Sequence, residues 1–139
     1  MRLGVTLLEL LTALSLIGVV SALAIPAMAQ ARDRTAVHGA ASALVATLAD
    51  ARHLAQRWHR RTAVAFDTVA ARAVVHAGPD TLATLSLREL FQVSLEASRD
   101  SIAFYPTGLG FGAANTRLIL SRGASAETVT VSRAGRVRR

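Results

Sequence analysis

The first part of the chain is one long apolar run with a single charge inside it. Between Leu3 and Ala31 the only ionisable side chain is Glu9, and Leu10 to Ala31 alone is 22 residues without a charge. At about 1.5 Å per residue, a helix of this length crosses the ~30 Å hydrocarbon layer of a bilayer. A charge within such a segment is disfavoured by roughly 2.5–3.5 kcal/mol, so Glu9 is a candidate functional residue.

Three interpretations compete for this run. A secretory signal peptide would use Arg2 as its basic start and Ala27-Met28-Ala29 as its cleavage site, but Glu9 interrupts the apolar part and the run is longer than a signal peptide needs. A buried core helix would usually be shorter. We therefore favour a retained membrane helix. The slight excess of basic charge at Arg2 and the start amine over residues 32–34 favours a cytoplasmic N-terminus.

Past the apolar run, hydrophobic residues recur at alternating spacings of four and three. This stripe consists of Val37, Ala41, Leu44, Leu48, Ala51, Ala55 and Trp58. Such spacing places side chains on one face of a helix. The pattern predicts one helix from near Val5 to about Arg60, with its first half in lipid and its second half on a globular domain. The alanines in the stripe favour packing against a sheet over a coiled-coil seam.

After Arg61 the hydrophobic periodicity changes to two, which predicts strands and so an α+β fold. Thr62–Val69 and Arg72–Ala77 are expected to form strands around a short turn, and Gly78-Pro79-Asp80 is expected to end the second. Leu82–Ser98 is compatible with a strand or a short helix. The further β-like segments, separated by Gly-rich connectors, are Ile102–Tyr105, Arg117–Ser121, Glu127–Ser132 and Val137–Arg138.

Composition narrows the possible chemistry. The chain has no Cys and no Lys, its 16 basic residues are all Arg, and its net charge is +7. Without Cys there is no disulfide, thiol nucleophile or Cys-based zinc site; without Lys there is no Schiff base and no Walker-type phosphate loop. The positive charge suits an anionic surface or a nucleic acid only where it is clustered.

No catalytic or metal-binding set is apparent. The His residues form no H-E-x-x-H pair, and solvated or half-buried positions are expected for all four, which are His38, His53, His59 and His76. Gly108–Gly112 lacks the spacing and the following helix of a dinucleotide loop, so a strand connector is expected. No G-x-S-x-G elbow is present. We expect no enzyme activity, no cofactor, no metal ion and no small-molecule substrate.

Arginine is concentrated at the C-terminus. From Arg99 to the end the chain has seven Arg against two acidic residues. On a strand, Arg136 and Arg138 would project from one face, with Val137 on the other, and two guanidiniums on one face can hold successive phosphates. The candidate DNA-binding residues are Arg117, Arg122, Arg133, Arg136, Arg138 and Arg139. Solvated charge at a chain end is the alternative. No aromatic residues interleave with these arginines, so base stacking is not expected and any binding should be sequence-blind and salt-sensitive.

The N-terminus resembles a known processing signal. Gly4 followed by Val5-Thr6-Leu7-Leu8-Glu9-Leu10-Leu11, with Pro26 further on, is similar to the class III signal of type IV pilins and type II secretion pseudopilins. The resemblance implies that a prepilin peptidase cuts after Gly4 and that the new N-terminus, Val5, is methylated. It also implies that Glu9 acts in subunit assembly. Gly18 and Pro26 are two weak points in the helix, and the resemblance implies that the stretch between them can lose helicity in a filament.

The chemistry of Glu9 fits this resemblance. In a helix Val5 and Glu9 are about one turn apart on one face. The freed ammonium group of Val5 in a neighbouring subunit would neutralise the Glu9 carboxylate in a low dielectric, and the pair would set the axial stagger of subunits in a filament. The alternative is that Glu9 extends to the membrane interface and has no partner there.

The C-terminal half carries a second resemblance. Residues 102–108, then Leu118-Ile119-Leu120, Val129-Thr130-Val131 and Gly135-Arg136-Val137-Arg138, are similar in order to the GspH/FimT pseudopilin family. The resemblance implies a pilin-like fold, a long N-terminal helix packed on an antiparallel β-sheet. It divides the chain into a leader (1–4), a transmembrane and filament-core helix (5–31), and a head (32–139) made of an amphipathic helix (32–61) and a β-rich part (62–139).

Two functions are implied by these resemblances. The leading one is a GspH-like minor pseudopilin of a type II secretion system, held by one membrane span in the bacterial inner membrane with its head in the periplasm. Its partners would be other pilin or pseudopilin subunits and the prepilin peptidase. The alternative is a FimT-like minor type IV pilin, because FimT-like relatives are associated with DNA uptake and share the Gly-Arg-x-Arg ending. A membrane-anchored periplasmic enzyme is a third hypothesis, which an ordered catalytic set would favour.

Overall fold

The computed structural model describes residues 6–111 and 115–139 and divides the chain into two compact units, Met1–Arg32 and Asp33–Arg139. One helix, α1 (Leu7–Arg57), contributes to both units. The second unit, which we call the head, also contains β-strands and the short helix α2 (Leu87–Phe91). The expected α+β class is therefore confirmed.

Within the first unit, the apolar side chains of α1 are exposed. Leu7 is 78% exposed and Ile25 is 67% exposed, and the most apolar 18-residue window of the helix contains no buried residue. A core helix would bury such side chains within its own domain. This segment is long and apolar enough to cross a membrane. It continues through Gly18 and Pro26 without a break, so loss of helicity between them stays a prediction about the assembled filament.

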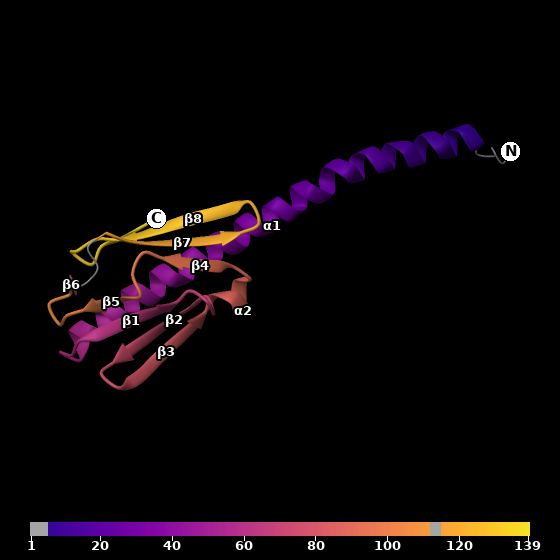
Figure 1. Cartoon of the computed structure of the whole chain (residues 1–139). Helices are drawn as coiled ribbons and strands as arrows, with labels where there is room; N and C mark the ends of the chain where they lie inside the picture. Colours follow the sequence, from indigo (N-terminus) through magenta and orange to yellow (C-terminus); the bar gives the residue numbers. More distant parts are fainter. Residues whose placement is uncertain (1–5, 112–114) are drawn as a thin grey trace. The chain divides into compact units, whose positions relative to one another are not determined.

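The head contains two antiparallel sheets. Sheet A has the order β3-β2-β1-β5-β6, with β1 (Thr62–Asp67), β2 (Arg72–Ala77), β3 (Asp80–Ser86), β5 (Ser101–Phe104) and β6 (Gly110–Phe111). Sheet B has the order β4-β7-β8-β9, with β4 (Ser94–Ala97), β7 (Thr116–Arg122), β8 (Ser125–Val131) and β9 (Val137–Arg138). Figure 1 shows the C-terminal part of α1 running along both sheets.

The core forms between this part of α1 and the inner faces of the two sheets. Leu44 and Leu48 of α1 are fully buried together with Phe104 of β5 and Leu118 of β7. Every member of the predicted stripe is buried except Trp58, which is 45% exposed. That prediction is wrong because α1 ends at Arg57, so the helical period no longer applies at Trp58.

The turn after β1 differs from the sequence expectation. The strand ends at Asp67 because this carboxylate closes a turn: the Ala70 N–H donates to Oδ1 at 2.9 Å, and Arg72 lies 3.0 Å from Oδ2. The bond from Ala70 and the charge of Arg72 hold the pKa of Asp67 below its usual value. This short-range bonding pattern ends the strand two residues before the predicted Val69.

The segment Leu82–Ser98, whose sequence is compatible with a strand or a short helix, contains both. β3, α2 and β4 follow one another between Asp80 and Ala97. Asp80 also begins β3 rather than ending β2, so only Gly78 and Pro79 connect the two strands. Gly78 has a φ of 67°, a conformation that glycine adopts without strain and other residues rarely adopt.

Candidate functional site

Thr6 caps the start of α1, and Glu9 is the third residue of the helix. The Glu9 N–H donates to Thr6 Oγ1 at 3.2 Å. Thr-x-x-Glu is the sequence signature of a capping box, and a carboxylate in the first turn is also favoured by the helix dipole. The charge pattern of the sequence does not reveal this role of Thr6, whereas the Thr-x-x-Glu spacing does. The Glu9 side chain is exposed, and no described residue forms an ion pair with it.

Gly4 and Val5 lie outside the described residues. Cleavage between them and methylation of Val5 therefore stay predictions, as does the pairing of a neighbour's Val5 ammonium with Glu9. The described helix begins at Leu7, directly after its Thr6 cap.

Two of the candidate DNA-binding arginines are bound to carboxylates inside the head. Arg122 Nε lies 2.9 Å from Asp33 Oδ1 on α1. Arg139 Nε lies 2.7 Å from Glu127 Oε1, and its Nη2 reaches His38 Nδ1 at 2.8 Å. These contacts attach the end of β7 and the C-terminus to α1. Arg122 and Arg139 therefore contribute to the packing of the head, and their contact with DNA stays a prediction.

The other four candidates are exposed; they are Arg117, Arg133, Arg136 and Arg138. Arg117 lies opposite Thr130 of β8, and Thr130 lies opposite Arg138 of β9. The two arginines therefore share one face of sheet B, two strands or about 10 Å apart. Val137 packs against the core on the other face, and Arg136 lies just before β9. The structure thus places exposed guanidiniums on the outer face and turn of sheet B.

Metal chemistry finds no support in the described ranges. No group of three or more His, Asp or Glu side chains in residues 6–111 and 115–139 has the geometry to hold a metal ion. His76 Nδ1 is 3.2 Å from Thr81 Oγ1, and His38 Nδ1 is 3.4 Å from Glu127 Oε2. These histidines therefore have ordinary polar neighbours.

Solved structures with a similar fold include a minor pilin and a minor pseudopilin. The chain matches the type IV minor pilin FimU of Pseudomonas aeruginosa with a TM-score of 0.63 and 16% identity, over 76% of this chain and 88% of that one. It matches the minor pseudopilin EpsH from the Type 2 Secretion System of Vibrio cholerae with a TM-score of 0.58 and 14% identity, over 73% and 94%. No protein-family model and no curated protein matches the sequence. At these identities the likeness shows the fold, and the expected pilin-like architecture is confirmed.

Proposed function

We propose that this chain is a minor pseudopilin of a type II secretion system. It enters the inner membrane through α1, is cut after Gly4 by a prepilin peptidase, and is methylated at Val5. It then joins other pilin-like subunits in a periplasmic pseudopilus that exports proteins. The observation that carries this proposal is an exposed apolar helix with one carboxylate, Glu9, which continues into the core helix of a pilin-like head.

The exposed first half of α1 has to be covered by an apolar environment. Its large apolar side chains are exposed, so they need lipid or other apolar helices to cover them. A filament core made of such helices supplies a second apolar environment when the subunit leaves the bilayer. In either environment, burying the Glu9 carboxylate costs free energy unless a cation pairs with it. The α-ammonium group of a neighbouring subunit is such a cation.

A FimT-like role in DNA uptake is the second candidate. It is favoured by the exposed guanidiniums of Arg117 and Arg138 on one face of sheet B, with Arg133 and Arg136 near the turn between β8 and β9. Contacts of this kind bind phosphates without reading sequence, and their strength falls as salt rises.

Deletion of the gene in its own bacterium separates the two candidates. As a pseudopilin, the chain should be required for release of secreted proteins into the medium, while surface pili and DNA uptake stay at the wild-type level. Immunoblots of the medium, pilus counts and transformation frequency provide the three readouts. Normal secretion together with lost pili or lost DNA uptake would contradict the leading proposal.

Complementation of the deletion with Arg136→Ala/Arg138→Ala provides the matched control. Under the leading proposal this variant restores secretion fully, because the two side chains are exposed and outside the core. Under the alternative it assembles normally but leaves DNA uptake several-fold below the wild-type level.

A further inference from the structure

The outer face of sheet A contains a row of four residues with a large ring at each end. His76 of β2 lies opposite Ala63 of β1, Ala63 lies opposite Ala103 of β5, and Ala103 lies opposite Phe111 of β6. Neighbouring strands are about 4.8 Å apart, so the two rings are separated by about 14 Å. Between them lie two alanines with short side chains, Ala63 half-buried and Ala103 buried. We call this row, with Arg60 and Arg61 beside it, the trough.

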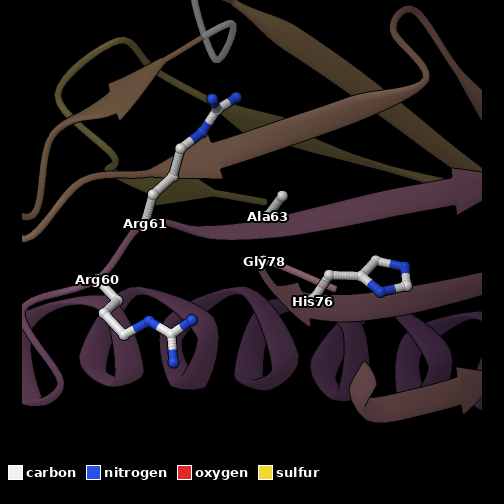
Figure 2. Close-up of a pocket in the computed structure, with 5 residues that line it drawn as sticks. All are labelled: Arg60, Arg61, Ala63, His76 and Gly78. Atoms are coloured by element: carbon white, nitrogen blue, oxygen red, sulfur yellow. The ribbon is translucent and has the colours of Figure 1, made fainter. Parts of the chain in front are cut away.

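Cationic groups line the trough. Arg61 precedes Ala63 by two residues, which places both on the same face of β1. Figure 2 shows Arg61 on one side of β1 in this view, and Arg60 and His76 on the other. The Arg60 guanidinium lies against the turn at Gly78, where an added Cβ would be 3.4 Å from Nη2. No described carboxylate pairs with either arginine.

Two hollows open along the trough and share Arg61. One has a volume of about 420 Å³ and is lined by Arg60, Arg61, Ala63, His76 and Gly78. The other has a volume of about 410 Å³; it includes Ala103 and Phe111 and holds one acidic residue, Asp100, next to Arg99. Volumes in this range are typical of sites for small organic groups. The trough therefore offers two adjacent places for such groups with a guanidinium between them.

An aromatic platform lies at the Phe111 end. Phe111 is 59% exposed as a residue, the Arg61 guanidinium carbon is 5.9 Å from its ring centroid, and the Tyr105 ring meets it edge-on with its centroid 5.8 Å away. The neighbouring Gly110 N–H donates to the carbonyl of Arg133 at 3.3 Å. Aromatic rings are thus interleaved with arginines in space, although none lies near the C-terminal arginines in the sequence.

We propose that the trough binds single-stranded nucleic acid, with phosphates at Arg60 and Arg61 and a base stacked on Phe111. Guanidiniums beside exposed rings are the combination used by proteins that bind single strands without sequence preference. An acidic peptide would pair with the arginines but leave Phe111 without a stacking partner. The trough lies on sheet A, whereas Arg117 and Arg138 lie on sheet B, so this site is separate from the C-terminal arginines. The proposal goes beyond the assembly function and does not depend on which filament the chain joins.

The test is fluorescence anisotropy of the full chain, purified in a non-ionic detergent, with a labelled short oligothymidylate. We expect binding at low salt and a loss of about tenfold or more in affinity for Arg61→Ala/Phe111→Ala, because one stacked base contributes about 1–3 kcal/mol. Arg61→Ala alone should reduce the slope of log affinity against log salt by about 0.7, as one lost phosphate contact does for a single strand. Arg61→Lys should keep this slope but lower affinity, because Lys retains the charge without the planar group.

Arg34→Ala removes one exposed arginine on α1 that lines neither hollow; it is the matched control and should leave oligothymidylate binding unchanged. Circular dichroism melts confirm that each variant is folded. Three results would overturn the proposal. The first is an affinity that Arg61→Ala/Phe111→Ala does not change. The second is equal competition by a polyglutamate peptide, which would indicate an acidic protein partner. The third is no binding by the wild-type chain at low salt. None of these results affects the assembly function, which the deletion experiment tests separately.

Discussion

A Glu9→Gln chain should be inserted and processed normally but should enter filaments more than about a hundredfold less than the wild type. Removing one partner of a buried ion pair costs about 3–5 kcal/mol, because the other charge is left uncompensated. Quantitative immunoblots of the filament and membrane fractions measure this ratio. A large defect is expected only if the carboxylate meets a cation between subunits.

Replacing Glu9 by Gln removes the negative charge and keeps a residue that fits this position of the helix cap. The Glu9 N–H donates to Thr6 Oγ1, and a capping box accepts Gln as well as Glu at this position. The helix start is therefore preserved while the charge is lost. Glu89→Gln, on the exposed surface of α2, is the matched control and should assemble like the wild type. Normal assembly of the Glu9→Gln chain would contradict the proposed role of the carboxylate.

A Leu48→Ala chain should lose about 3 kcal/mol of head stability. Leu48 is fully buried where α1 meets the sheets, and Leu→Ala at such sites costs about 2–5 kcal/mol through lost apolar contact and the cavity left behind. Urea unfolding of the full chain in detergent, followed by circular dichroism, measures the change.

Leu90→Ala provides the comparison for this experiment. Leu90 is 65% exposed, so its truncation should change the free energy of unfolding by less than about 0.5 kcal/mol. Equal effects of the two substitutions would show that the second half of α1 does not form the core of the head.

The sequence predicted the long elements of this fold because their physical signals are local. The four-and-three spacing identified the buried face of α1, and period-two patterns located β1, β2, β5, β7 and β8. Trp58 was assigned to the core because periodicity contains no signal for where a helix stops. Asp67 ended β1 early through side-chain bonds that a hydrophobic pattern does not record.

The division into two sheets required contacts between distant residues. β1 pairs with β5 across the intervening strands, and β4 pairs with β7 instead of β3, so no local pattern specifies the sheet order. The trough could not be predicted from the sequence for the same reason, because Arg61 and Phe111 are fifty positions apart in the sequence and meet only after folding. The partners of Arg122 and Arg139 could not be predicted either, because Asp33 meets Arg122 through the packing of α1 on sheet B, and Glu127 lies on β8, the strand that pairs with β9.

In the proposed function, α1 belongs to a processed filament subunit that is cut between Gly4 and Val5. Intact-mass spectrometry of the chain isolated from its own bacterium tests this most directly. We expect a mature protein that begins at Val5 and carries one methyl group on its terminal amine. A chain that begins at Gln30, or one that retains Met1 through Gly4, would contradict it.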